Sequence, residues 1–168
     1  MTVTGVRASL TKSLANKRTN DQVVESVVAE DIGKLPDTTI AESLARLPGV
    51  TTQRDRNGNA TNITIRGLGP DFNGYLLNGR EQASTGDSRG VEFDQFPAEL
   101  LSGVLIYKTP DAGLVGQGLS STIDLRTVRP LDFGKRAVAA NYRKQRTGID
   151  SGAGEGKGDR VALSYVDQ

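Results

Sequence analysis

The stretch ATNITIRGLGPDFNGYLLNGRE, residues 60–81, decides the fold of this chain. Polar and β-branched residues alternate through Ile63 and Ile65, a pattern that predicts a strand with one buried face. The strand ends on a charged residue, Arg66. Glycines follow it at Gly67, Gly69, Gly74 and Gly79. So many glycines favour tight loops and close backbone approaches. A rigid enzyme core rarely needs so many tight glycine loops. A structure that is held in place and later released does need them.

Short strands and short helices alternate on both sides of this stretch. Strands are predicted at residues 23–28, 74–81, 103–110 and 121–130, and a hairpin at 50–67 with its turn at Asn57-Gly58. Helical segments are predicted at 29–36, 37–50 and 96–103, the last with Pro97 near its first position. The segments 81–93 and 111–121 are predicted as loops.

The clearest helix signal lies at residues 37–50. Thr39 and Glu42 have the spacing of a capping box. An apolar stripe follows at Ile40, Leu44 and Leu47, and Pro48-Gly49 ends the helix.

The N-terminal residues 1–22 leave two readings open. Leu10 and Leu14 have the spacing of one or two helical turns, with Lys12, Lys17 and Arg18 directed outward. The segment is otherwise polar, and we favour an irregular tail.

Two alternating runs follow Pro130, at residues 137–146 and 160–167, around a glycine-rich loop at 147–159. Each run is apolar or small on one side and polar on the other. This pattern is typical of a strand that faces lipid on one side and water on the other, and also of any half-buried hairpin. The second run continues almost to the C-terminus, so we expect the chain to be a piece of a longer protein.

Composition excludes several classes of function. The 168 residues carry a formal net charge of +1 and are only 5% aromatic, which argues against nucleic acid as a partner. The chain has no Cys and no His, which removes thiolate and imidazole metal ligands and the common nucleophile–base pairs. The start of a calcium loop at residues 55–59 fails, because its twelfth position is Arg66. We expect no cofactor, no metal and no enzymatic activity. No apolar stretch approaches the roughly 20 residues that a transmembrane helix needs.

The order of elements between residues 23 and 129 resembles the plug, or cork, domain of the TonB-dependent outer-membrane receptors of Gram-negative bacteria. The motifs that carry this resemblance are LPGV at 47–50, IRG at 65–67, LNG at 77–79 and YKTPDAGLVGQGLSSTIDLRT at 107–127. The resemblance implies an α+β fold in which short helices pack on a small mixed sheet. It also implies a tail at 1–22, a plug at 23–130, and the first hairpin of a β-barrel at 131–168.

Several site residues follow from the resemblance. Arg66 matches the arginine that pairs with barrel glutamates in this family, and Lys108 stands where the family has a second such arginine. Lysine keeps the charge but loses the bidentate fork. The resemblance implies ligand-facing loops after Arg66 and after Asn78. The candidate residues in these loops are Asp71, Phe72, Asn73, Gln82, Asp87 and Arg89. Thr2, Val3, Thr4 and Gly5 resemble the end of a TonB box, the segment that TonB binds by strand addition.

The function implied by the resemblance is gated, energy-dependent uptake of a scarce nutrient across the outer membrane. An iron chelate, cobalamin or a carbohydrate would be the extracellular ligand, and TonB and the chain's own barrel would be the partners. The alternative is a stand-alone periplasmic or signalling binding module with a similar α+β fold.

Overall fold

The computed structural model describes residues 4–28, 39–56, 58–84, 86–93, 96, 100–116, 118–129, 131, 136–146 and 157–167. The chain divides into two units, Met1–Thr127 and Val128–Gln168. Helices occur in the first unit, and among the described residues none is long and apolar enough to cross a membrane.

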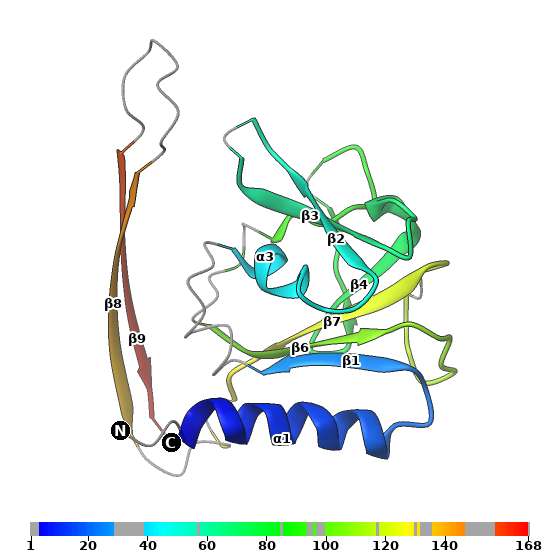
Figure 1. Ribbon diagram of the computed structural model, residues 1–168, viewed down its shortest axis with the longest axis horizontal. Coiled ribbons are helices and arrows are strands. Elements are labelled where there is room, and N and C mark those ends of the chain that lie inside the picture. Colours follow the sequence, from blue (N-terminus) through cyan, green and yellow to red (C-terminus); the bar gives the residue numbers. More distant parts are fainter. Residues whose placement is uncertain are drawn as a thin grey trace. The chain divides into compact units, whose positions relative to one another are not determined.

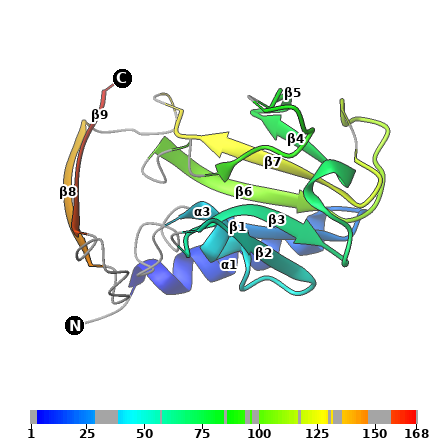
Figure 2. The same ribbon diagram turned by 90° about the horizontal axis from the view of Figure 1, so that it is seen from above.

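A five-stranded mixed sheet forms the centre of the first unit, in the order β1–β6–β7–β4–β5 (Figures 1 and 2). Its strands are β1 (Val24–Val28), β4 (Asn73–Leu77), β5 (Arg80–Glu81), β6 (Leu101–Tyr107) and β7 (Ser121–Thr127). Strands β4 and β7 run parallel, whereas the other neighbouring pairs are antiparallel. The sheet and its helices confirm the α+β fold expected from the sequence.

The segment 74–81 is a tight hairpin rather than the single strand predicted from its sequence. Asn78 and Gly79 both have positive φ, 52° and 78°, and they turn the chain from β4 back into β5. An Asn-Gly pair suits this turn because both of its central residues need left-handed backbone.

A second layer is built by α3 (Ile40–Leu44) and the hairpin of β2 (Val50–Arg54) with β3 (Ala60–Ile65). Figure 1 shows α3 beside β2, on the same side of strands β1 and β6. The predicted cap is present, since the Thr39 side chain accepts a hydrogen bond from the Glu42 amide. The apolar core joins the two layers. Its members include Val27, Ile40, Leu44, Ile63, Ile65, Tyr75, Phe93, Val104, Ile106, Ile123 and Leu125.

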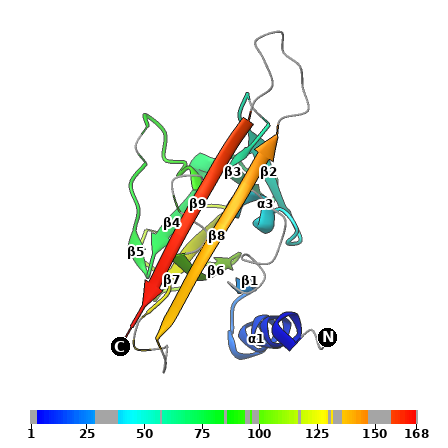
Figure 3. The ribbon, with the colours of Figure 1, turned by 90° about the vertical axis from the view of Figure 1, so that its left-hand side faces the viewer.

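The N-terminal segment forms a helix, α1 (Thr4–Thr19), so the irregular tail that we favoured is wrong. Figures 1 and 3 show α1 running alongside β1, the edge strand of the sheet. Two hydrogen bonds and an ion pair between Lys17 of α1 and Glu25 of β1 join them. Asn16 Nδ2 donates to Ser26 Oγ over 3.4 Å, and Ser26 Oγ donates to the Ser13 carbonyl over 3.4 Å.

The apolar spacing in α1 does not mark its buried face. Leu10 and Leu14 are 54% and 56% exposed, whereas Ser9 is fully buried. The helix was not favoured from the sequence because hydrogen bonds and an ion pair help to hold it to β1, and such contacts give no hydrophobic periodicity.

Two other predicted helical segments had different outcomes. The segment 29–36 lies outside the described residues. For the helix predicted at 96–103, residues 97–99 also lie outside the described residues. Its last three residues, 101–103, belong to β6. That part of the prediction is wrong because strands on both sides supply backbone partners: Gly103 pairs with Val28, and Leu101 pairs with Thr127.

The second unit contains one antiparallel hairpin of β8 (Ala137–Arg146) and β9 (Lys157–Val166), which confirms the two predicted alternating runs. Strand β9 begins earlier than predicted, at Lys157, and residues 147–156 of the predicted loop lie outside the described residues.

Candidate functional site

Arg66 lies on a sharp, hydrogen-bonded turn at the end of β3. Its φ of 54° is in the left-handed region, and Gly67 follows with φ 78°. The Arg66 amide donates to the Gly49 carbonyl over 2.9 Å, and the Leu68 amide closes the turn on the Ile65 carbonyl over 3.1 Å. The Arg66 side chain is exposed, and none of the ion pairs within the described part of the chain uses it. A fixed backbone therefore presents a free guanidinium.

A buried polar cluster anchors this turn from the inside. Asn73 is 1% exposed, and its Nδ2 donates to the Ile63 carbonyl over 3.1 Å. Asn73 Oδ1 accepts from Ser121 Oγ over 2.9 Å. Ser120 Oγ lies 3.0 Å from both Asn73 Oδ1 and the Ile65 carbonyl oxygen, so its single proton serves either acceptor. The cluster ties the end of β3 to the starts of β4 and β7.

Asn73 is therefore buried rather than part of an exposed loop, and because it also lines the pocket described below, its contact with a ligand stays a prediction. Its position beside two predicted loop residues suggested exposure, but Asn73 begins β4 and its side chain points into the protein. A buried amide surrounded by acceptors and hydroxyls has a structural role, because each of these groups would otherwise lose its hydrogen-bond partner.

Two loops that are distant in sequence are held together by Asp71. Its Oδ1 accepts hydrogen bonds from the Arg89 amide over 3.0 Å and the Gly90 amide over 3.1 Å. The approach at Gly90 is so close that a Cβ there would lie 2.7 Å from Pro70 Cβ. These two hydrogen bonds, which we call the Asp71 clasp, bring the loop after Arg66 against the loop after β5.

An open pocket of about 240 Å³ lies beside this clasp, and we call it the apical pocket. Its lining includes Tyr75, Glu81, Gln82, Ser84, Ser88 and Arg89. The pocket thus brings together three of the predicted ligand-facing residues, Asn73, Gln82 and Arg89, and Asp71 forms the hydrogen bonds beside it. Phe72 and Asp87 are exposed but do not line the pocket.

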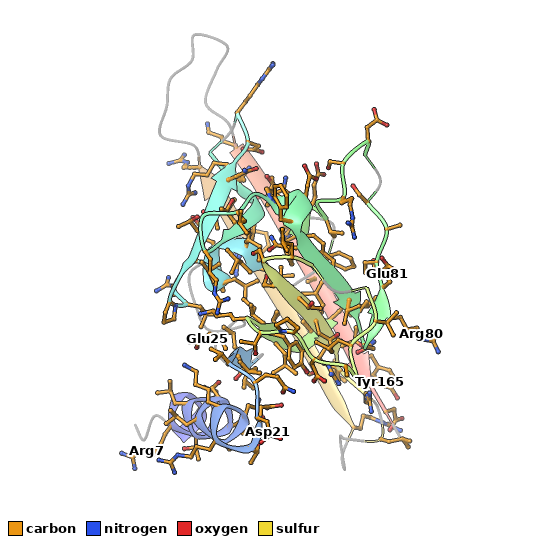
Figure 4. All side chains as sticks on the ribbon, turned by 90° about the vertical axis from the view of Figure 1, so that its right-hand side faces the viewer. Arg7, Asp21, Glu25, Arg80, Glu81 and Tyr165 are labelled. Carbon is orange, nitrogen blue, oxygen red and sulfur yellow. The ribbon has the colours of Figure 1, made fainter. Side chains whose placement is uncertain are left out.

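Glu81, which the sequence did not single out, contributes a carboxylate to the pocket. Figure 4 shows Glu81 and Arg80 at the same edge of the first unit, where β5 ends the sheet. Gly116 has φ 63°, a left-handed conformation that favours glycine, and a Cβ there would meet the flexible end of the Glu81 side chain at 2.9 Å. Burial raises the pKa of the nearby Tyr75 hydroxyl, and the Asp71 carboxylate adds to this effect, so the phenol stays protonated as a hydrogen-bond donor. The hydroxyl donates to the Pro70 carbonyl over 3.0 Å.

Lys108 is not presented to a partner in the way that Arg66 is. It is 8% exposed, and its Nζ donates to the Pro48 carbonyl over 2.5 Å and lies 3.6 Å from Glu25 Oε1. The other oxygen of the Glu25 carboxylate forms an ion pair with Lys17 of α1. The expected outward role of Lys108 therefore conflicts with its position, because burial and two internal partners occupy its charge.

The remaining predicted site lies at the N-terminus. Thr4 and Gly5 belong to the first turn of α1, and Thr2 and Val3 lie outside the described residues. Among the residues that the structure describes, no group of three or more acidic, His or Cys side chains is arranged to hold a metal ion.

Comparison with known proteins gives two findings. The model of the TonB-dependent Receptor Plug Domain family matches residues 16–122. Similar solved structures include the Serratia marcescens hemophore receptor HasR in complex with its hemophore HasA and heme, at 21% identity and a TM-score of 0.56. They also include the siderophore receptor PirA from Pseudomonas aeruginosa, at 22% identity and a TM-score of 0.54. The alignments cover 86% and 83% of this chain but only 22% and 24% of those receptors. These findings do not favour the alternative of a stand-alone binding module.

Proposed function

The chain belongs to the TonB-dependent receptor plug domain family, and on this premise we propose that it gates an outer-membrane transporter. In this proposal the first unit closes the lumen of a β-barrel, and TonB, acting from the periplasm, displaces it during uptake of a scarce nutrient. Many modest polar contacts suit such a gate, because they can be broken one after another. The presentation of Arg66 carries the proposal: an exposed charge on a sharp turn that is anchored by buried hydrogen bonds.

Arg66 would act as the lock between plug and barrel. Its guanidinium can pair bidentately with a carboxylate on the barrel wall, a geometry that gives strong and directional hydrogen bonds. We do not assign the same role to Lys108, because its ammonium group is buried against Pro48 and Glu25.

The apical pocket would receive the extracellular ligand. Arg89, Gln82 and Glu81 offer a cation, an amide and a carboxylate within one small cavity. This mixture suits a polar ligand with both donor and acceptor groups, and iron chelates, cobalamin and carbohydrates all meet that description. Phe72, which is 47% exposed, and Asp87 would then contact ligand outside the pocket.

The hairpin of the second unit would supply the first two strands of the barrel. Its register aligns Val138 with Tyr165, Ala140 with Leu163, and Tyr142 with Val161, and all six side chains are exposed. Each tyrosine hydroxyl bonds to a carboxylate beyond this apolar band: Tyr142 to Asp159 over 2.8 Å, and Tyr165 to Asp167 over 2.6 Å. An apolar band with aromatic residues at both ends is typical of a lipid-facing barrel surface.

TonB would bind residues 2–5 by adding them as a strand to its own sheet. Thr4 and Gly5 lie in the first turn of α1, so this turn would have to unwind before strand pairing. Loss of one terminal turn costs little, because helix ends fray readily.

The proposed lock can be tested by Arg66→Ala in the complete receptor. A charged hydrogen-bonded contact contributes about 1.5–3 kcal/mol, so its loss should raise the population of displaced plug roughly ten- to a hundredfold. We expect faster leakage of small solutes into cells that express the variant. Arg80→Ala is the matched control, because Arg80 is also an exposed arginine of the first unit. Leakage and uptake equal to those of the unmodified receptor would contradict the lock.

A further inference from the structure

We propose that Lys108 and Glu25 position the turn that carries Arg66, acting through the backbone of Pro48 and Gly49. The inference rests on the proposed lock at Arg66, because it explains how that residue is held ready. It also gives Lys108 a role that agrees with its buried position.

The first step is the link between Lys108 and the Arg66 backbone. Lys108 Nζ binds the carbonyl of Pro48 over 2.5 Å, and the carbonyl of the next residue, Gly49, accepts the Arg66 amide over 2.9 Å. Two consecutive carbonyls thus connect the lysine to the lock. A change in the orientation of the Pro48 carbonyl would be transmitted to Gly49 through a single residue.

The second step is that Gly49 lies at the surface. It has φ 70°, and a Cβ built on it would find no atom within 4 Å. Glycine has more accessible backbone conformations than any other residue, so hydrogen bonds to its neighbours help to fix the orientation of an exposed glycine. The Lys108 ammonium on one side and the Arg66 amide on the other meet that need.

The third step is the charge balance around Lys108. A buried ammonium group needs a paired carboxylate, since an unpaired charge in the interior is costly and draws water or moves toward it. Glu25, itself 8% exposed, provides that carboxylate at 3.6 Å. Lys17 pairs with the same carboxylate, but its side chain is 40% exposed. Solvent screens its charge, so Lys17 should affect the orientation of Glu25 less than Lys108 does.

The Lys108 side chain can be changed without removing the backbone hydrogen bonds that hold the end of β6 beside Val23. The Lys108 amide donates to the Val23 carbonyl over 2.8 Å, and the Val23 amide donates to Thr109 Oγ1 over 3.1 Å. These contacts involve no part of the lysine side chain. Methionine at position 108 would keep the apolar stem and remove only the charge and its hydrogen bonds.

The test is amide hydrogen exchange measured residue by residue on the 168-residue chain. In Lys108→Met, we expect the Arg66 amide to exchange about tenfold faster, because its acceptor is no longer fixed. Amides in the β6–β7 ladder should keep their rates.

Lys108→Arg, which keeps the charge and donors, should restore most of the protection at Arg66. Glu25→Gln should act in the same direction as Lys108→Met, and Lys17→Met should have little effect.

Unchanged exchange at Arg66 in Lys108→Met, with the β6–β7 ladder intact, would overturn the inference. If Lys108→Met instead speeds exchange throughout the first unit, Glu25→Gln decides: faster exchange confined to the Arg66 turn supports the inference, and uniform or unchanged exchange refutes it. These rates are measured without a barrel. They are therefore separate from the leakage test, and normal leakage in Arg66→Ala would refute the lock while leaving the positioning role intact.

Discussion

At the scale of single residues, Asn73 and Lys108 are buried polar side chains that bond to backbone carbonyls near the exposed Arg66. Asn73 bonds to the Ile63 carbonyl and to Ser121, and Lys108 bonds to the Pro48 carbonyl. Both fix backbone near Arg66, and both are less than a tenth exposed. Both roles were predicted from the family resemblance, which says nothing of burial, whereas here the side chains supply partners to backbone carbonyls in the interior.

Asn73→Ala should destabilise the first unit by about 1–3 kcal/mol, because it leaves buried hydroxyl and carbonyl groups without a partner. The denaturant midpoint of the 168-residue chain measures this loss. Asp87→Ala is the control, since Asp87 is exposed and should leave the midpoint in place. Equal midpoints for the two variants would show that the Asn73 cluster does not stabilise the fold.

At the scale of elements, the glycine loop before β7 determines how closely β4 and β7 can begin side by side. A Cβ at Gly118 would lie 2.1 Å from the Gly74 nitrogen and 2.5 Å from the Ser121 oxygen. These are backbone atoms of the two strands that pair in parallel, so no side-chain movement can relieve the clash. The glycine therefore allows the chain to pass beside the starts of both strands.

Gly118→Ala should consequently cost more than about 3 kcal/mol, at the upper end of the range for overpacking. Gly69→Ala provides a matched comparison in a nearby loop, because its φ is −62° and no atom lies within 4 Å of a Cβ built there. Thermal unfolding of both variants would measure the difference. A Gly118 variant as stable as the Gly69 variant would contradict the close approach.

At the scale of the whole molecule, the chain combines two units with different kinds of surface. The first buries an apolar core between its sheet and the layer of α3, β2 and β3. The second exposes apolar side chains along one face of a hairpin, among them Leu163 at 77%. A two-stranded hairpin is marginally stable alone in water, and exposed apolar faces need a partner or a lipid phase. The two units therefore suit different environments, as the proposed plug and barrel require.

Leu163→Arg tests the proposed lipid face in the complete receptor. Leu163 lies in the middle rung of the apolar band, opposite Ala140, where an arginine should cost about 2–4 kcal/mol in a bilayer. We expect less folded receptor, seen as loss of the heat-modifiable band in gel electrophoresis. Ala162→Arg alters the neighbouring position, which alternation places on the opposite face, and should be tolerated better. The reverse order of severity would exclude the proposed orientation of the hairpin.

The sequence by itself determined most of the local structure and the family. Asn-Gly pairs, the Thr39 cap and alternating runs specify turns, a helix start and strands through interactions between neighbouring residues. These signals identified the β2–β3 and β8–β9 hairpins and the start of α3 correctly, but α3 ends at Leu44, before the predicted stop at Pro48-Gly49. The order of short motifs carried the resemblance that the match to residues 16–122 confirmed.

The tertiary structure alone decided how far α1 extends and which polar residues turn inward. The helix docks through serines and an asparagine, and residues 101–103 joined a strand because β1 and β7 offered backbone partners. Asn73 and Lys108 found their acceptors on segments far away in sequence. Such contacts depend on which carbonyls and charges folding brings together, and no local pattern of residues encodes that.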